Sequence, residues 1–464
     1  MDPLPISTIA EYASATLTGG DAATLITRVS TDSRTLQPGD LFVAIRGDNF
    51  DGHKFVEQAA ERGATGALVE QSGSGNVPET FALLRVPDTL VGYQQIAAGY
   101  RRSLPLKVIC ITGSNGKTST KDFVAATLGR RFRVTKTEGN FNNHIGLPRT
   151  ILEASAQHEA AVWELGMNHP GEIEALAAIA RPDAGIITNI GIAHIEFMGS
   201  QEAIAQEKGM LAEAIGSDGI VILNADDDFT ESIAGRTRAK VISVGMQRGA
   251  MRATDITQSA SGSEFTILEG AHRCRAQLPV PGLHMVQNAM LAVAAGRALG
   301  MSLEDCAAGL ASTPLTKARL QLREVHGVQF LDDSYNANPE SMNAALRTLV
   351  ELDADGRRFA VLGHMGELGT QSERGHAEIG ETAAALRIDY LIVVGELAAG
   401  VARAAQAAGL ENTLHVATPA AAASFLAEQA SAGDLVLIKG SRSARMEQVL
   451  EEFAQRASLG EVTR

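Results

Sequence analysis

A short glycine-rich segment, residues 113–118 (GSNGKT), combines the residue types that bind nucleotide phosphates. It lies between an apolar, β-branched run and a run with helical spacing, which is the context of a phosphate-binding loop. In such a loop the glycines let backbone amides surround the phosphate oxygens, and the helix N-terminus adds positive potential. Lys117 would then contact the β and γ phosphates, and the hydroxyl of Thr118 would bind Mg²⁺. The alternative is a glycine-rich turn with a solvated lysine.

The spacing differs from the usual GxxxxGK[ST] pattern, because position 111 is isoleucine rather than glycine. The segment is therefore a shortened variant of the loop, and it predicts binding of ATP or GTP. The predicted nucleotide-binding residues of the segment are Gly113, Ser114, Asn115, Gly116, Lys117, Thr118 and Ser119.

Two polar residues, Glu164 and His194, end further strand-like runs (VWELG and IITNIGIAH). Ligands of an open parallel sheet gather beyond the carboxyl ends of its strands, so both side chains are expected to face the nucleotide. A carboxylate suits Mg²⁺, whereas histidine is an unusual ligand for so hard an ion. The alternative is a pair of polar strand ends. Lys208, on the next helical run, is a less obvious candidate for a functional residue, because a helical lysine usually lies on a solvated face.

Two segments in the last third of the chain are dense in polar groups. Residues 332–339 (DDSYNANP) close a strand-like run and start a helical one, and residues 439–443 (KGSRS) end another strand-like run. Polar groups at the carboxyl end of a strand indicate a site, and the cations of the second segment could contact carboxylate or phosphate. Capped helices with solvated charges are the alternative.

The elements that would position these residues alternate between strands and helices. In the centre, the strand-like runs are 107–112, 160–165, 184–190 and 219–223, and the helical runs are 118–128, 171–180 and 201–215. This alternation predicts a βαβ series with a parallel sheet. Residues 251–280 read as alternating strands and predict an antiparallel addition, followed by helices near 284–299 and 303–311.

Two further α/β units flank the centre. Beyond a boundary near 313–317, strand-like runs recur at 328–332, 359–362, 390–394, 414–416 and 435–438. Before residue 88, strand-like runs lie at 40–44 and 66–69, and a helix near 90–102 connects this unit to the centre. We therefore predict three domains, at 1–88, 89–316 and 317–464.

Composition narrows the class of protein. The chain has 464 residues, of which 45% are hydrophobic and 20% charged, as in soluble globular proteins. Its net charge of −14 disfavours non-specific binding to nucleic acid or to an anionic membrane. No apolar run reaches transmembrane length and the opening MDPL lacks a basic n-region, so we expect a cytoplasmic protein. Cys110, Cys274 and Cys306 form no CxxC motif and are expected to be reduced core thiols.

Several segments together resemble the Mur ligase family, the ATP-dependent amino-acid-adding enzymes of peptidoglycan synthesis. They are 31–55 (TDSRTLQPGDLFVAIRGDNFDGHKF), 112–120 (TGSNGKTST), 138–150 (EGNFNNHIGLPRT), 164–173 (ELGMNHPGEI), 188–200 (TNIGIAHIEFMGS), 333–342 (DSYNANPESM) and 439–447 (KGSRSARME). The resemblance spans nearly the whole chain. It implies an α/β fold of three domains, in which a central parallel-sheet P-loop ATPase domain is flanked by an N-terminal α/β domain that binds UDP and a C-terminal Rossmann-like α/β domain.

The resemblance also implies roles for individual residues. Lys117, Lys208 and His194 would be catalytic, and Lys208 matches a lysine that is carbamylated in several members. Thr118, Glu164 and His194 would bind Mg²⁺. Contacts to ATP are implied for Asn288 on the adenine side, Arg319 at the γ-phosphate and Asp333 at the ribose. Contacts with the substrates are implied for three groups of residues. Ser33 and Arg34 would belong to the nucleotide-sugar pocket, together with Asp32 and residues 51–53. Asn142 and Asn143 would also bind substrate, and Asn336, Asn338 and Ser341 would lie near the incoming amine.

The member that these segments resemble most joins D-alanyl-D-alanine to the terminal carboxylate of UDP-N-acetylmuramoyl-tripeptide. ATP would phosphorylate that carboxylate, and the amine of the dipeptide would then displace phosphate. Arg319 and Asp333 lie in a different domain from the loop, so closure is expected to assemble the site. We expect a monomer without nucleic-acid partners and without membrane insertion.

Three positions depart from the family pattern: Met285, His364 and Met210 stand where Asn, Asp and Glu are usual. Met285 and Met210 are expected to adjust packing, whereas His364 argues against a role of that position in binding the amine.

Three other classes of protein share the loop. A folylpolyglutamate synthase would lack the region at 31–55, and a ligase that adds a diamino acid would need a DNPR-like segment, which the chain lacks. A P-loop switch protein without ligase activity is the alternative from another class.

Overall fold

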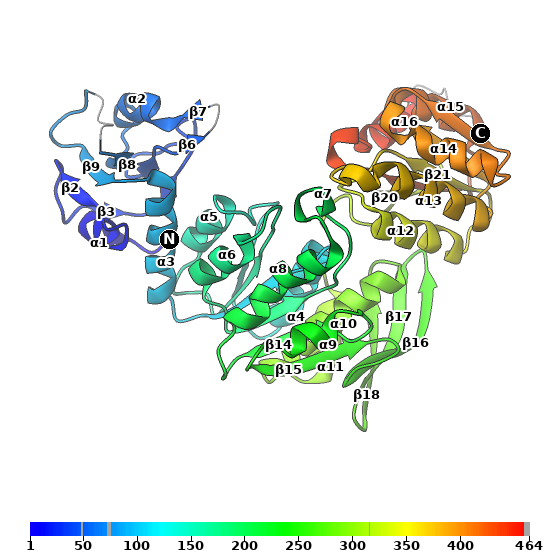
Figure 1. Cartoon of the computed structure of the whole chain (residues 1–464), viewed down its shortest axis with the longest axis horizontal. Helices are drawn as coiled ribbons and strands as arrows, with labels where there is room; N and C mark the ends of the chain where they lie inside the picture. Colours follow the sequence, from blue (N-terminus) through cyan, green and yellow to red (C-terminus); the bar gives the residue numbers. More distant parts are fainter. Residues whose placement is uncertain (48–49, 72–75, 315, 459–464) are drawn as a thin grey trace.

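The computed structural model describes residues 1–47, 50–71, 76–314 and 316–458, and it shows three α/β domains with the central one between the other two (Figure 1). Each domain is built on its own mixed or largely parallel sheet. The predicted fold class is therefore confirmed. The boundaries at residues 88 and 316 stay a prediction.

The N-terminal domain is built on a five-stranded sheet with the order β2-β9-β8-β5-β4. Its strands are β2 (Thr16–Thr18), β4 (Val29–Ser30), β5 (Leu41–Val43), β8 (Gly66–Glu70) and β9 (Ala82–Val86), and its helices are α1 (Ile6–Tyr12) and α2 (Val56–Glu61). Two short antiparallel pairs complete the domain: β1 (Leu4–Pro5) pairs with β3 (Leu25–Ile26), and β6 (Arg46–Gly47) pairs with β7 (Phe50–Asp51). The turn η1 (Gly52–Phe55) follows β7. Only β2 pairs antiparallel within the main sheet. The strands predicted at 40–44 and 66–69 are confirmed.

Helix α3 (Thr89–Ser103) joins this domain to the central one. It begins after Asp88, whose Oδ1 accepts hydrogen bonds from the backbone amides of Leu90 and Val91. The helix packs on α1 and also on α5 (Gly146–Glu153) and α6 (Glu172–Ala180), so one hydrophobic cluster runs through both domains. A side chain at Gly99 would collide with the ring of Tyr12, which explains why glycine lies at this contact.

The central domain contains a nine-stranded sheet with the order β11-β12-β10-β13-β14-β15-β16-β17-β18. The strands are β10 (Lys107–Thr112), β11 (Val134–Lys136), β12 (Ala160–Glu164), β13 (Ala184–Ile187), β14 (Ile220–Asn224), β15 (Lys240–Gly245), β16 (Met251–Ser259), β17 (Gly262–Glu269) and β18 (His272–Leu278). Pairing is parallel from β11 to β16 and antiparallel from β16 to β18. The predicted βαβ series and the antiparallel addition are confirmed, and the addition continues the same sheet.

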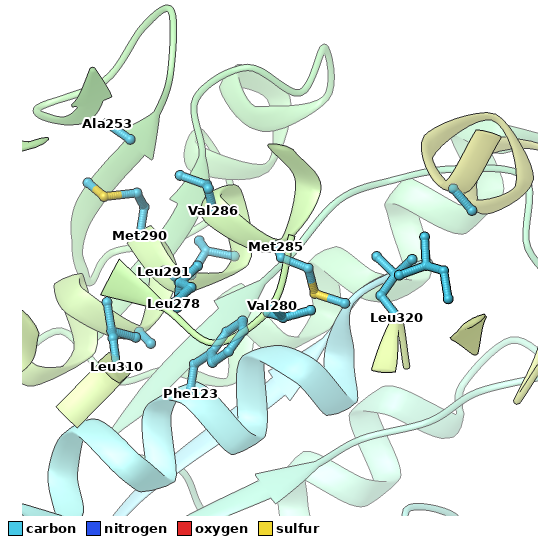
Figure 2. Packing of buried hydrophobic residues seen from close by; sticks show 14 of the residues in the cluster. Phe123, Ala253, Leu278, Val280, Met285, Val286, Met290, Leu291, Leu310 and Leu320 are labelled. Atoms are coloured by element: carbon cyan, nitrogen blue, oxygen red, sulfur yellow. The ribbon is translucent and has the colours of Figure 1, made fainter. Parts of the chain in front are cut away.

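The helices of the central domain are α4 (Lys117–Gly129), α5, α6, α7 (Ile195–Met198), α8 (Gln201–Ala214), α9 (Thr230–Ala234), α10 (Leu283–Ala298) and α11 (Leu303–Ala311). Helix α10 is apolar on all sides and buried, because it lies between α4 and the strands β14 to β16. Figure 2 shows Phe123 of α4 and Leu310 of α11 beside the side chains of α10. Met285 is part of this core and Met210 contacts Arg236, so both departures from the family pattern are packing positions.

The C-terminal domain has a six-stranded sheet with the order β19-β20-β24-β21-β22-β23. The strands are β19 (Gln321–Val325), β20 (Val328–Asp333), β21 (Arg358–Leu362), β22 (Tyr390–Val394), β23 (Thr413–Val416) and β24 (Leu435–Lys439). The helices are α12 (Pro339–Glu351), α13 (Ser372–Ala385), α14 (Ala399–Ala407), α15 (Pro419–Gln429) and α16 (Glu447–Ser458), and the short turns are η2 (Gly369–Gln371), η3 (Glu396–Ala398) and η4 (Arg442–Ala444). The five predicted strands are confirmed and pair in parallel, as in a Rossmann-like sheet, and β19 adds an antiparallel edge.

Two further expectations concern membranes and thiols. None of the helices among the described residues combines the length and hydropathy needed to span a bilayer. All three cysteines are free thiols. Cys110 and Cys306 are buried, but Cys274 is not a core residue, because it lies on β18 at the open edge of the sheet and is only partly buried.

Candidate active site

The glycine-rich segment forms a loop between β10 and α4, as predicted. Gly113 and Gly116 both have positive φ, +148° and +78°. A Cβ at Gly113 would lie 1.8 Å from Oγ1 of Thr188, and one at Gly116 would lie 2.5 Å from the side-chain oxygen of Asn288. Glycine is therefore required at both positions by backbone conformation and by close neighbours.

The loop is braced from outside by the segment that follows β13. The amide of Asn115 donates to Oδ1 of Asn189 (2.9 Å), and its carbonyl accepts from the hydroxyl of Thr188 (2.5 Å). The hydroxyl of Ser114 accepts from the amide of Gly191 (2.8 Å). Sequence reasoning identified the loop but missed Thr188 and Asn189, whose signal is the polar pair directly after a buried apolar strand.

Lys117 folds back over the loop, and its Nζ donates to the carbonyl of Gly113 (2.8 Å). Desolvation lowers the pKa of Lys117; the nearby carboxylate of Glu164 opposes this shift in pKa, and the charge of Arg319 adds to it. The solvated lysine of the alternative interpretation is therefore wrong. Ser119 is buried in the first turn of α4.

Glu164 and Thr118 meet beneath the loop. Glu164 ends β12, next to β10, and its Oε2 accepts from the hydroxyl of Thr118 (3.0 Å). Its Oε1 accepts from the side-chain amide of Asn142 (2.8 Å). Asn142 thus lies beside the predicted metal ligand, whereas Asn143 caps the N-terminus of α5 by accepting from the amide of Gly146 (2.8 Å).

His194 does not end a strand, which corrects the prediction. β13 ends at Ile187, because residues 188–191 bond to the P-loop instead of extending the sheet. His194 instead precedes α7 with a left-handed backbone (φ 64°). Its Nδ1 lies 2.6 Å from Oε2 of Glu367 in the C-terminal domain, and this contact lowers the pKa of the Glu367 carboxyl.

Lys208 lies inside α8 and is buried, so the solvated helical face considered for it is wrong. Burial lowers the pKa of Lys208 well below its usual value, and the charge of Lys117 acts in the same direction. In the part of the chain that the structure describes, no hydrogen bond or ion pair reaches its ammonium. The adjacent Glu207 is used elsewhere, since it accepts from the amides of Gly171 and Ile173 (both 2.8 Å).

The C-terminal domain contributes directly to the P-loop. Nη2 of Arg319 lies 3.3 Å from Oγ1 of Thr118, and its guanidinium stacks over the ring of Tyr335 at 4.1 Å. The side-chain amide of Asn338 donates to Oδ1 of Asn115 (2.8 Å). Two of the predicted C-terminal residues, Arg319 and Asn338, therefore contact the glycine-rich loop, although Asn338 is predicted near the incoming dipeptide.

The other predicted residues of this domain are engaged within it. Asp333 is buried and accepts from Lys439, which also donates to the carbonyl of Asn336 (3.0 Å). The solvated charges of the alternative interpretation are therefore wrong for Lys439. Ser341 forms a capping box with Asn338 at the start of α12. His364 contacts the hydroxyl of Ser443 (2.8 Å), so the departure at this position is accommodated by a polar contact.

Ser33 and Arg34 lie in the N-terminal domain, which Figure 1 shows on the opposite side of the central domain from the C-terminal domain. Arg34 makes a bidentate pair with Asp32, with both distances 2.9 Å, and this lowers the pKa of Asp32 to about 2. Ser33 is buried. In the 51–53 stretch, the imidazole of His53 lies between Asp51 and the backbone amide of Glu70.

The chain therefore combines a P-loop ATPase sheet with a second α/β domain that supplies an arginine to the loop. Family models match most of it: the Mur ligase middle domain at 111–296, the Mur ligase glutamate ligase domain at 318–442 and the Mur ligase family catalytic domain at 25–93. The chain belongs to the Mur ligase family.

Individual relatives are similar over nearly the full length. The UDP-N-acetylmuramoyl-tripeptide–D-alanyl-D-alanine ligase of Bacillus subtilis is 39% identical over 97% of this chain and 98% of its own. A crystal structure of MurF from Acinetobacter baumannii is 33% identical with a TM-score of 0.90, covering 98% of this chain and 99% of that one. MurF ligase from Thermotoga maritima, in complex with ADP, is 28% identical with a TM-score of 0.85, covering 93% and 98%.

Proposed function

We propose that this chain is an ATP-dependent ligase that joins D-alanyl-D-alanine to the terminal carboxylate of UDP-N-acetylmuramoyl-tripeptide in peptidoglycan precursor synthesis. The similarity in sequence and fold to ligases named for this reaction supports the proposal. The observation that carries the chemistry is at Thr118, which contacts Glu164 of the central domain and Arg319 of the C-terminal domain. This geometry supports the proposal, because a carboxylate and a cation from different domains both contact one hydroxyl of the glycine-rich loop.

The residues around Thr118 fit Mg²⁺. Its hydroxyl and the carboxylate of Glu164 are oxygen donors, which this ion prefers, and we propose them as ligands together with His194. Among the described residues, no three His, Cys, Asp or Glu side chains form a metal cage. Mg²⁺ commonly binds through one or two carboxylates together with nucleotide phosphates and water. When bound, the ion would neutralise charge on the transferred phosphoryl group.

The residues of the chain would then act in order. Backbone amides of 113–118 and Lys117 hold the β and γ phosphates, which requires Lys117 to leave the carbonyl of Gly113. Arg319 stabilises the γ-phosphoryl group while a carboxylate oxygen of the tripeptide attacks phosphorus and ADP leaves. The dipeptide amine attacks the acyl carbon, its proton is lost, and the C–O bond breaks to release phosphate. Asn288, beside Gly116, is proposed on the adenine side and Asp333 at the ribose.

Lys208 is proposed to be carbamylated. Burial favours its neutral amine, which is the form that reacts with carbon dioxide to give a carbamate and a proton. The product carries a negative charge, which the nearby Lys117 would favour rather than oppose. Carbamylation would therefore convert a buried neutral amine into an anion with a cationic neighbour.

Both substrates need further contacts. We propose that Ser33 and Arg34 contribute to the nucleotide-sugar pocket, that Asn142 and Asn143 contact the same substrate, and that Asn336, Asn338 and Ser341 lie near the incoming dipeptide. The chain is further proposed to act as a monomer in the cytoplasm. The third residue of the tripeptide, lysine or diaminopimelate, is to be identified by assaying both.

Release of phosphate from ATP tests the proposal against a P-loop switch protein. A ligase releases ADP and phosphate only when the UDP-tripeptide and the dipeptide are both present. Release with neither substrate would contradict the proposal, and product formed from the UDP-linked precursor that lacks the third residue and free diaminopimelate would assign a sister ligase. Omitting each component in turn supplies the controls.

A further inference from the structure

The loop after β13 connects the P-loop to the C-terminal domain. At its start, Thr188 and Asn189 hold Asn115 of the P-loop. Further along, the amide of Ile192 donates to Oε1 of Glu340 in α12 (2.8 Å). At its end, His194 meets Glu367. The loop is therefore held from both sides, by the P-loop and by two carboxylates of another domain.

The pair of His194 and Glu367 has two unusual features. Nδ1 of His194 is buried and makes no aligned hydrogen bond among the described atoms, although Oε2 of Glu367 lies 2.6 Å from it in an ion-pair contact. Both residues have left-handed backbones, with φ of 64° and 60°, although neither is glycine. Such conformations cost free energy and persist where the surrounding structure enforces them, commonly at functional sites.

Backbone and side-chain contacts around the pair link the same two segments. The amide of Glu196 lies 3.4 Å from the carbonyl of Glu367. A side chain at Gly369 would touch Glu196, so glycine permits this approach. Figure 1 shows α7, which begins next to His194, at the edge of the central domain that faces the C-terminal domain. The segment around His194 and the segment around Glu367 therefore form part of the interface between the central and C-terminal domains.

We propose that Glu367 is a positioning residue, which holds Nδ1 of His194 when the C-terminal domain docks and thereby fixes the imidazole with Nε2 as the nitrogen that is available to a ligand. This deepens the proposed function and rests on it for the role of His194 in metal binding. A carboxylate that holds one ring nitrogen is the usual way in which proteins fix the tautomer and orientation of a metal-binding histidine. Because Glu367 belongs to the other domain, this contact forms only in the docked arrangement.

The tautomer of His194 tests this without nucleotide, metal or turnover. In protein labelled with ¹⁵N-histidine at about pH 8.5, where imidazole is normally neutral, the His194 signal is identified by its loss in His194→Gln. We expect the Nδ1–H form in the native chain and in Glu367→Gln, whose amide oxygen still accepts a hydrogen bond. Glu367→Ala is expected to shift His194 to the Nε2–H form. Glu373→Gln, which removes an exposed carboxylate from the same domain, is the matched control and should match the native chain.

Distances between spin labels test the coupling to docking. Labels on Glu202→Cys in α8 and Arg403→Cys in α14, in a Cys274→Ser background, report the separation of the two domains. Without ligands, Glu367→Ala should broaden the distribution toward longer distances, and Glu373→Gln should leave it unchanged. Unchanged tautomer and unchanged distances in Glu367→Ala would overturn the proposal, and so would a change in only one of them.

Kinetics separate this inference from the proposed function. Glu367→Ala should raise the Mg²⁺ concentration for half-maximal rate by about tenfold or more, the usual effect of removing such a partner, while KM for the UDP-tripeptide stays unchanged. A native chain that makes no ligation product would end the proposed function. The tautomer and distance results would still decide the positioning role of Glu367.

Discussion

Arg319 and Thr118 are 201 positions apart in the sequence, yet Nη2 of Arg319 lies 3.3 Å from Oγ1 of Thr118. Thr118 lies at the start of the P-loop helix, and Arg319 lies just after the boundary predicted for the C-terminal domain. The arginine is held by the ring of Tyr335, and among the described residues its buried Nε has no hydrogen-bond partner. A buried guanidinium with an unsatisfied donor is ready to accept an anion, as a γ-phosphate would require.

Replacing Arg319 by alanine is expected to lower kcat by more than about 100-fold, because the cation at the transferred phosphoryl group is lost. Arg319→Lys should not restore kcat, because the ammonium of lysine is a point charge, whereas the planar guanidinium presents parallel N–H donors to the phosphoryl oxygens. Steady-state kinetics measure the effect. Arg323→Ala, on the exposed side of β19, is the control and should retain native kcat. A kcat for Arg319→Ala within threefold of the native value would contradict the role.

Tyr335 is expected to orient Arg319 through its ring and not through its hydroxyl. Tyr335→Phe preserves the stacking surface and should keep the native rate. Tyr335→Ala removes a cation–π contact of about 1 kcal/mol and should lower kcat roughly fivefold or more. If phenylalanine lowers kcat as much as alanine does, the hydroxyl and not the ring is the relevant group.

Gly116→Ala is expected to weaken ADP binding roughly five- to thirtyfold, the equivalent of about 1–2 kcal/mol. The new Cβ would lie 2.5 Å from the side chain of Asn288, and the backbone has a φ of +78°. Strain of about 1–2 kcal/mol would therefore fall on the loop. Calorimetric titration with ADP measures the change. Gly129→Ala, at the other end of the same helix with no atom within 4 Å of the new Cβ, is the matched control. Equal binding by both variants would contradict the tight fit.

Lys208→Ala is expected to lose activity, and short-chain carboxylic acids should partly restore it by replacing the carbamate. Lys240→Ala, which changes an exposed lysine on β15, should lose nothing and should not respond to the acids. The assay is initial rate against acid concentration. Full activity of Lys208→Ala would remove carbamylation from the mechanism.

His284 makes stability depend on pH. Burial lowers the pKa of His284 to about 4, against an ordinary value of about 6.5. Between these values the unfolded chain binds more protons than the folded one, so the free energy of unfolding falls as pH falls. His284→Gln should therefore lose less stability than the native chain from about pH 7.5 to 4.5, by on the order of 2 kcal/mol. Urea unfolding at both pH values measures this, and equal losses in the two proteins would contradict it.

The sequence alone predicts most of the fold because local signals are strong where strands are buried on both faces. The apolar, β-branched run at 107–112 and its partners identify the parallel sheets. Strands without this signal are missed: β19 (QLREV) is mostly polar and lies at a sheet edge, and β4 has only two residues. The end of β13 is predicted three residues too late, because bonds to the P-loop decide where it ends.

The candidate site is predictable from the sequence wherever one continuous segment contains all the residues that would bind the ligand. The P-loop needs only its own glycines, lysine and threonine. Burial of Lys208 cannot be read from helical spacing, since it depends on how α8 packs on other elements. Glu367 carries no signal at all in the sequence, because its role comes from a contact 173 positions away, between 194 and 367. Contacts between domains leave no local signal in the sequence, and the approach of Arg319 to the loop is predicted only through the family resemblance.

The fate of one oxygen atom tests the central claim most directly. The protein is incubated with ATP, D-alanyl-D-alanine and UDP-N-acetylmuramoyl-tripeptide that carries ¹⁸O in its terminal carboxylate. The masses of the products are then measured by mass spectrometry. The mechanism predicts a UDP-linked pentapeptide and inorganic phosphate that carries one ¹⁸O, since the oxygen that attacks phosphorus leaves with it. Phosphate without ¹⁸O, or phosphate released without any pentapeptide, would contradict ligation through an acyl phosphate.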